Sequence, residues 1–130
     1  MNFSLLVLGA PYSDQSVTTA LRFAEAVTAS GHSIYRIFFY HDGVNSANAL
    51  ITPPQDETNI PLRWQQLADK NGIDLVVCIA SALKRGVLDK IEADRYEQAG
   101  DNLTAGFTIS GLGQLIDAGA HSDRLVTFGP

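Results

Sequence analysis

Cys78 is the only cysteine among the 130 residues of this chain. It ends the apolar segment 73–78, which is typical of a buried strand, and a helix-forming segment follows it. In open parallel α/β sheets the functional groups gather beyond the carboxyl ends of the strands. A chain with one thiol cannot form an internal disulfide, so a group bound to a reactive Cys78 must pass to another molecule. The residue therefore indicates either a covalent carrier or an inert side chain of the core.

The residues after Cys78 favour the carrier. The first turn of a helix has unpaired backbone N–H groups, and these stabilise a thiolate that lies beside them. Lys84 and Arg85 lie one to two turns further along and add positive charge, and Ser81 lies between them and the cysteine. The alternative is that these are ordinary solvated helix residues. For a carrier, we expect the sulfur to be reachable from solvent at the rim of the sheet.

His41 is the histidine best placed to support Cys78. It ends the second predicted strand and so emerges at the same edge of the sheet, with Asp42 beside it. Of the other histidines, His32 follows the predicted helix stop at Gly31 and begins a strand, and His121 lies in the final loop with a structural or solvated role. We therefore name His41 and Asp42 as candidate supporting residues, with loop anchoring as the alternative for His41.

The spacing around Cys78 excludes several familiar cysteine enzymes. A phosphatase-type cradle needs an arginine after five intervening residues, and Lys84 occupies that position. A rhodanese-type loop is also unmatched, because the position after four intervening residues holds Leu83. Without a C-x-x-C pair, a dithiol cycle within one chain is also excluded.

No cofactor or metal ion is predicted. Gly111 and Gly113 follow a predicted strand, but the third glycine of a dinucleotide fingerprint would fall at Ile116. The glycines are better explained by a tight turn and close helix packing. A flavin-binding or nucleotide-binding module remains a minor alternative.

Composition limits the classes of partner. A net charge of −5 argues against direct binding of nucleic acid, which needs clustered Lys and Arg. The first residues lack a basic leader, and no apolar run approaches the roughly 20 residues of a membrane span. We expect a cytoplasmic protein that binds no membrane.

Strand-like and helix-like segments alternate along the chain, which predicts an α/β fold. The expected architecture is a single domain over residues 1–130, a three-layer α/β/α sandwich with a five-stranded, mainly parallel sheet. Residues 41–56 form a long connection that we expect to be functional or mobile. The predicted strands are 3–8, 34–40, 73–78, 107–110 and 124–128, and the predicted helices are 13–31, 60–71, 81–85, 88–98 and 112–118.

Several segments, in order and spacing, resemble the TusD/DsrE family of sulfur-relay proteins over nearly the whole chain. The resemblance implies the α/β layering of that family, and it implies that Cys78 is the persulfide-bearing residue. At position 81 this chain has Ser where many relatives have Ala, and we expect this difference not to impair the function. The segments are 9–12 (GAPY), 38–44 (FFYHDGV), 52–54 (TPP), 77–87 (VCIASALKRGV) and 110–115 (SGLGQL).

The resemblance also implies partners. Relatives assemble with TusB-like and TusC-like subunits, or their DsrH and DsrF counterparts, into a dimer of heterotrimers. Sulfur would arrive from a TusA-like donor and leave to a TusE-like or DsrC-like acceptor. The predicted pathway is synthesis of 2-thiouridine at the wobble position of tRNA, with no direct contact to the nucleic acid. The alternatives are a DsrE-type subunit of a sulfur-oxidation relay and a non-catalytic structural subunit of a related complex.

Overall fold

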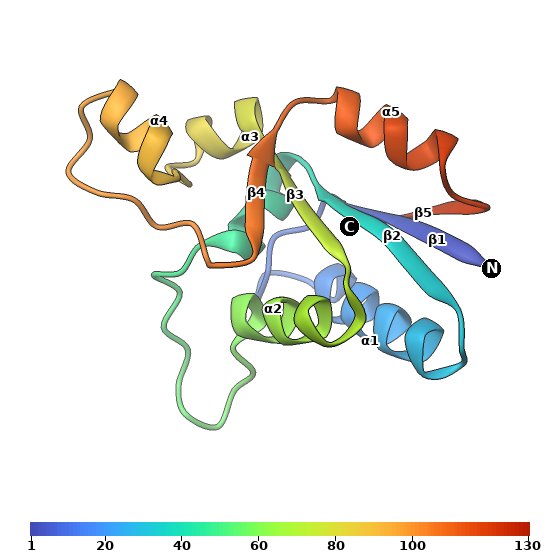
Figure 1. Cartoon of the computed structure of the whole chain (residues 1–130). Helices are drawn as coiled ribbons and strands as arrows, with labels where there is room; N and C mark the ends of the chain where they lie inside the picture. The colour runs from blue at the N-terminus through green and yellow to red at the C-terminus, as the bar shows by residue number, and fades with distance from the viewer.

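Five parallel strands form the centre of the molecule, with helices on both faces (Figure 1). The structure is a computed structural model that describes residues 1–130. Each predicted strand is present, within two residues of its expected bounds. The elements in chain order are β1 (Asn2–Val7), α1 (Ser16–Ala29), β2 (Ser33–Phe39), the 3₁₀ helix η1 (His41–Ala47), α2 (Ile60–Asn71), β3 (Asp74–Cys78), α3 (Ile79–Lys84), α4 (Lys90–Arg95), β4 (Phe107–Ser110), α5 (Gly113–Ala120) and β5 (Arg124–Phe128).

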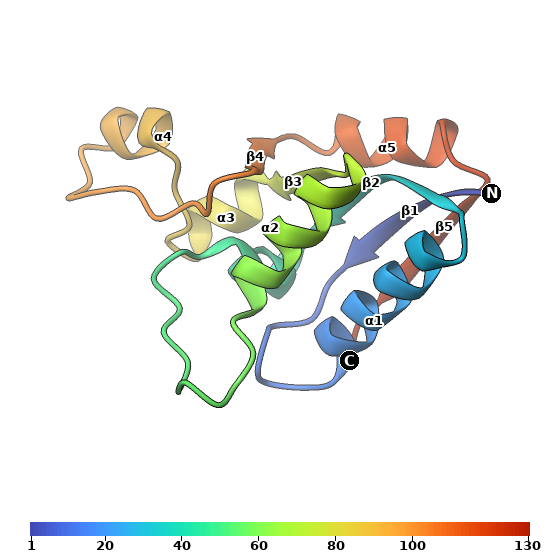
Figure 2. The same cartoon turned by 60° about the horizontal axis from the view of Figure 1, so that its bottom comes forward.

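The order of strands across the sheet is β4-β3-β2-β1-β5, and every neighbouring pair is parallel. Helices α1 and α2 lie side by side on one face, and α5 lies on the other, as Figure 2 shows. The connection from β4 through α5 to β5 therefore crosses from one edge of the sheet to the other. The predicted three-layer α/β fold is confirmed, and the sheet is parallel throughout.

The larger core lies between the sheet and helices α1 and α2. Successive side chains of a strand point to opposite faces, so alternate residues of each strand enter this core. The Trp64 ring of α2 is fully buried and meets the Phe39 ring edge-on, with 5.3 Å between the ring centres. The strand residues of this face include Leu5, Val7, Ile37, Phe39, Leu75 and Val77.

A smaller core lies on the opposite face, where α5 is the covering helix. Its buried members are Phe38 of β2 and Val76 and Cys78 of β3. Partly buried side chains from three different elements complete it, and Cys78 is thereby placed on the thinly covered side of the sheet. These three side chains are Leu6, Tyr40 and Leu115.

A β-bulge in β2 attaches α5 to the sheet. The register between β1 and β2 shifts so that Tyr35 has no partner on β1, and such an extra residue re-aims the side chains around it. Tyr35 and Arg36, although adjacent, both bind Asp117 of α5: Tyr35 Oη donates at 2.7 Å and Arg36 Nη1 at 2.8 Å. Arg36 also donates to Asp74 of β3 at 2.7 Å. The position of α5 over the smaller core is therefore held by charge-assisted hydrogen bonds.

This network predicts a pH dependence of stability. The hydrogen bonds from Tyr35 and then Arg36 hold the pKa of Asp117 below its ordinary value of 3.8. A carboxylate with a lowered folded pKa contributes stability above its unfolded pKa, and that contribution is lost as the pH falls through the folded pKa. We expect Asp117→Asn to be less stable than the wild type at neutral pH, with the difference shrinking below pH about 4. Urea unfolding of both proteins across pH measures this, and a difference that stays constant into acid would contradict it.

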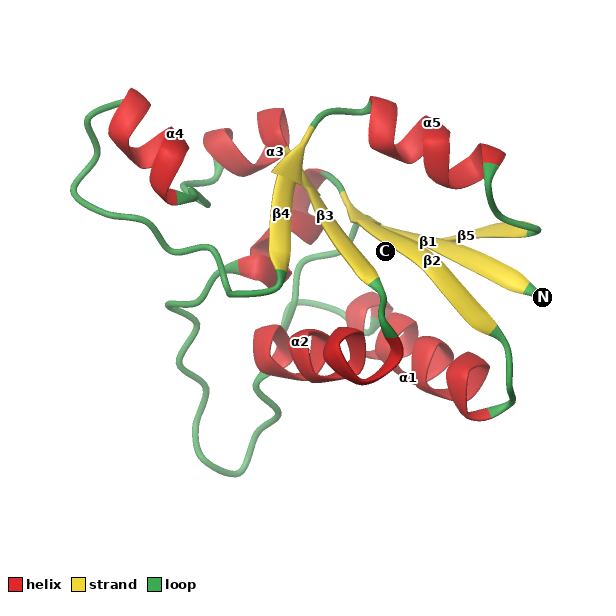
Figure 3. Cartoon of the chain, viewed as in Figure 1, coloured by secondary structure: helices red, strands yellow, loops and turns green.

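Two predicted segments differ from the structure. The helix expected over 88–98 is only Lys90–Arg95, because Asp89 caps it by accepting from the Glu92 backbone N–H at 2.8 Å and Glu97 takes a left-handed conformation with φ of 54°. The first part of the 41–56 connection is the 3₁₀ helix η1, whose Val44 and Ala47 enter the larger core. The rest of it runs to α2 without regular structure, as Figure 3 shows. None of the helices has the length and apolar character needed to cross a bilayer.

Candidate functional site

Cys78 joins a strand directly to a helix. It is the last residue of β3 and the N-cap of α3, with no loop between the two elements. Its backbone pairs with Ser110 of β4. We expected the first backbone N–H groups of α3 to stabilise the sulfur. The Cys78 side chain accepts no hydrogen bond from them.

The sulfur is not open to solvent. Cys78 is only 2% exposed and packs with Phe38 and Val76. The prediction that the sulfur is reachable at the rim is therefore wrong for the isolated chain. Three partly buried side chains pack against this cluster: Leu6 of β1, Tyr40, which follows β2, and Leu115 of α5. We call Tyr40 and Leu115 the cover of the sulfur.

Four of the predicted supporting residues lie together where η1 meets α3. The His41 backbone N–H donates to Ser81 Oγ at 3.1 Å. Arg85 Nε donates to Asp42 Oδ1 at 2.8 Å, and Arg85 Nη1 donates to the Ser81 carbonyl at 3.2 Å. We call this group of four, His41, Asp42, Ser81 and Arg85, the η1–α3 clip. It fixes the 3₁₀ helix to the helix that Cys78 begins.

The His41 ring is directed at Tyr40 and not at the thiol. His41 has φ of 49°, a left-handed conformation that is uncommon outside glycine. Its ring lies on the Tyr40 ring with 4.1 Å between centres, and no hydrogen bond joins the imidazole to Cys78. The His41 ring thus contacts Tyr40, which packs against the cluster that contains Cys78.

Gly43 allows η1 to sit on the end of β1. Its backbone N–H donates to the Tyr40 carbonyl at 2.9 Å. A Cβ at this position would lie 2.1 Å from the carbonyl oxygen of Val7, closer than any non-bonded contact allows. A glycine is therefore required to bring the η1–α3 clip beside the strand ends.

Lys84 is the predicted residue that does not join this group. Its side chain is exposed and makes no hydrogen bond or ion pair. It lines a separate pocket with Leu83, and Cys78 is not among the residues of that pocket. No group of three or more His, Cys, Asp or Glu side chains is arranged to hold a metal ion.

The cover was not predicted from the sequence, although the position of Tyr40 could have been. Tyr40 lies two residues after Phe38, so strand alternation puts both on the Cys78 face if β2 and β3 are neighbours. Leu115 could not be placed in this way. Its contact depends on α5 crossing the sheet to lie over β2 and β1, and the local pattern does not specify that path.

Comparison with known proteins identifies the family. Residues 1–128 match the family described as DsrE/DsrF-like. The chain belongs to this family. A Pseudomonas aeruginosa protein named sulfurtransferase TusD homolog is 50% identical over 129 residues, covering 99% of this chain and 98% of the relative. The sulfurtransferase TusD of an Enterobacter species is 45% identical, covering 98% and 100%. A DsrE protein of Allochromatium vinosum, described as a candidate sulfurtransferase, is 47% identical and covers 99% of both chains.

These DsrE/DsrF-like relatives confirm the predicted TusD/DsrE resemblance and the prediction of a sulfurtransferase. Among solved structures, the YchN protein of Escherichia coli superposes with a TM-score of 0.75 at 23% identity, covering 98% of this chain and 100% of that one. At that identity the likeness supports the α/β fold and nothing further.

The cover predicts how fast Cys78 reacts. Replacing Tyr40 by alanine removes one of the three side chains that pack against the cluster of Phe38, Val76 and Cys78. We expect Tyr40→Ala to be alkylated by iodoacetamide about tenfold faster than the wild type under native conditions, because less packing opposes local opening. The rate is followed by intact mass. Tyr96→Ala is the control, since Tyr96 is exposed and lies outside the cluster; equal rates in the two variants would show that Tyr40 is no cover.

Proposed function

We propose that this chain carries sulfur as a persulfide on Cys78 and passes it from a donor protein to an acceptor protein. The observation that carries the proposal is that Cys78 is the only thiol of a chain whose relatives are named sulfurtransferases. A persulfide needs a thiol, so within this chain no other residue could hold the sulfur. Its place at the carboxyl end of β3 is where parallel sheets collect functional groups.

The transfer needs no net oxidation. The Cys78 thiolate attacks the outer sulfur of a donor persulfide, a sulfur–sulfur bond forms to Cys78 Sγ, and the donor leaves as a thiolate. In the second step an acceptor thiolate attacks the outer sulfur of the Cys78 persulfide. The bond to Sγ breaks, and Cys78 returns to its thiolate. One proton is exchanged with solvent wherever a thiolate is formed from or returned to a thiol.

The burial of Cys78 gives this reaction two states. Cys78 is 2% exposed with the cover in place, which limits the access of small oxidants to its thiol. Attack by either partner requires Tyr40 or Leu115 to move. A partner that displaces the cover on docking would therefore gain access that bulk solutes lack.

The partners belong to the same proposal. We propose a TusA-like donor, a TusE-like or DsrC-like acceptor, assembly with TusB-like and TusC-like (or DsrH-like and DsrF-like) subunits, and a cytoplasmic location. The proposed outcome is 2-thiouridine in tRNA. Relatives are named both TusD and DsrE at similar identity, so a role in a sulfur-oxidation relay is the second candidate pathway.

A non-catalytic structural subunit is the rival role, and the burial of Cys78 favours it. Slow alkylation would fit either role, because the cover is closed in the isolated chain. The discriminating experiment incubates the chain with a persulfide-loaded TusA-like protein, removes the donor and records intact mass. The carrier gains one sulfur atom, mapped to the Cys78 peptide and removed by dithiothreitol. No gain in mass, or sulfur on another residue, would support the structural role.

A further inference from the structure

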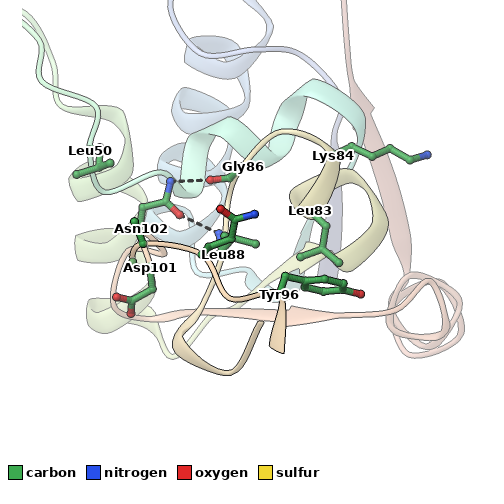
Figure 4. Close-up of a pocket in the computed structure, with 11 residues that line it drawn as sticks. Leu50, Leu83, Lys84, Gly86, Leu88, Tyr96, Asp101 and Asn102 are labelled. Carbon is green, nitrogen blue, oxygen red and sulfur yellow. Dashed lines mark hydrogen bonds between the residues drawn. The ribbon is translucent and has the colours of Figure 1, made fainter. Parts of the chain in front are cut away.

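The largest pocket of the molecule lies beside the site and has no part in the proposed transfer. Its volume is about 790 Å³, within the range of sites for small organic molecules. Figure 4 shows it between the end of α3, the chain after α4 and the start of the connection to α2. The wall is formed by Leu50, Leu83, Lys84, Gly86, Leu88, Tyr96 and the segment Gln98, Ala99, Gly100, Asp101 and Asn102.

One side chain holds this wall in a defined shape. Asn102 Oδ1 accepts from the Leu88 backbone N–H at 2.8 Å, and Asn102 Nδ2 donates to the Gly86 carbonyl at 2.9 Å (Figure 4). Asn102 Nδ2 also donates to Asn48 Oδ1 at 3.0 Å. Both amide protons and the amide oxygen are thereby engaged. Asn102 is thus a structural part of the pocket, and the polar groups left for a ligand are elsewhere.

The apolar part of the pocket is large and exposed. Leu50 is 72% exposed and Tyr96 is 55% exposed, so both side chains offer apolar surface to a ligand. In Figure 4, Leu83, Leu88 and Tyr96 gather at the centre of the drawing. The Tyr96 ring offers a flat apolar surface. A flat, apolar ligand body would cover these side chains.

The charges of the pocket are separated. Lys84 and Asp101 both lack a hydrogen bond or ion pair within the chain. In Figure 4, Lys84 and the Tyr96 hydroxyl point to one side, and Asp101 lies with Leu50 and Asn102 at the other. An anionic group is attracted to the Lys84 side and repelled by the Asp101 carboxylate. The charge pattern therefore orients an anion with its apolar body across the middle.

We propose that this pocket binds a small organic anion, with a flat apolar body against Leu83, Leu88 and Tyr96 and its acidic group at Lys84. The site is separate from the sulfur chemistry, because Cys78 does not line it. Lys84 thereby has a role other than support of the cysteine. The binding does not depend on whether the chain carries sulfur.

The test uses 8-anilinonaphthalene-1-sulfonate, a flat aromatic sulfonate, titrated into ¹⁵N-labelled protein. We expect amide shifts in the segments 83–88 and 96–102 and a Kd on the order of 100 µM. Lys84→Gln should weaken binding about fivefold to tenfold, because it removes the charge-assisted contact. Tyr96→Ala should weaken it as well. N-phenyl-1-naphthylamine, the same body without the sulfonate, should bind more weakly to the wild type.

Lys90→Gln is the matched control. It removes one exposed lysine from α4, outside the pocket, and leaves the same net charge as Lys84→Gln. Unchanged affinity in this variant, beside a loss in Lys84→Gln, supports the proposal. Equal affinities of wild type and Lys84→Gln, shifts outside the pocket residues, or equal binding of the neutral probe would each overturn it. None of these readouts depends on sulfur transfer, so their failure leaves the proposed function untouched.

Discussion

Cys78→Ser is expected to retain no sulfur after incubation with a donor that carries ³⁵S as its outer persulfide sulfur. The wild type should retain label that dithiothreitol removes. A serine hydroxyl is not a nucleophile toward a persulfide under these conditions and forms no stable adduct with sulfur. Because the chain holds no second thiol, the loss should reach background and not stop at a partial value. Label after gel filtration is the measurement.

The control for this variant concerns the fold. A hydroxyl placed between Phe38 and Val76 costs about 1 to 3 kcal/mol if it finds no partner. Cys78→Ala leaves no polar atom there and serves as the second variant. Both should show the wild-type far-UV spectrum and no label. Retained label in either folded variant would refute the assignment of Cys78.

Gly43→Ala is expected to lower the free energy of unfolding by about 3 kcal/mol or more. The added methyl would lie 2.1 Å from the Val7 carbonyl oxygen and 2.8 Å from the Val7 carbonyl carbon. Both atoms are backbone of the sheet, so no side-chain rotation relieves the contact. The 3₁₀ helix η1 must shift, and its clip to α3 through Asp42 and Arg85 is expected to break. Urea unfolding measures the loss.

Gly119→Ala is the matched control for this change. Gly119 lies in α5 with open space around the place of a Cβ, and alanine is favoured over glycine in a helix by up to about 1 kcal/mol. The same substitution should therefore leave stability unchanged or raise it. A Gly43→Ala protein as stable as Gly119→Ala would show that η1 tolerates displacement from β1. Faster alkylation of Cys78 in Gly43→Ala would link η1 to the cover.

The sheet could be read from the sequence because its signals are local. Runs such as Leu75 to Cys78 are continuous apolar segments, and the turns between elements contain Gly31, Gly72 and Gly86 in left-handed conformations. Strand direction follows from the alternation of strands and helices. The carboxyl ends of neighbouring parallel strands lie at one edge of the sheet. The sequence could therefore also predict the proximity of His41, Asp42, Ser81 and Arg85.

The burial of Cys78 could not be predicted from local sequence patterns. It depends on which helix crosses to the second face and where its apolar side chain lands, as Leu115 does. Those are contacts between residues far apart in the chain, and they depend on the order β4-β3-β2-β1-β5. The pocket at Lys84 likewise depends on Asn102 joining the backbone of Gly86 and Leu88 to the side chain of Asn48. No short pattern predicts such a junction.

Cys78 belongs at once to a hydrogen-bonded strand and to the first turn of a helix, with no linker on either side. A sulfur atom held there cannot swing between distant stations as a tethered arm would. In the proposed transfer, the donor and the acceptor would therefore have to visit one stationary point in succession. The interval between loading and unloading would then depend on the side chains that cover the sulfur, because the bound sulfur itself does not move between sites.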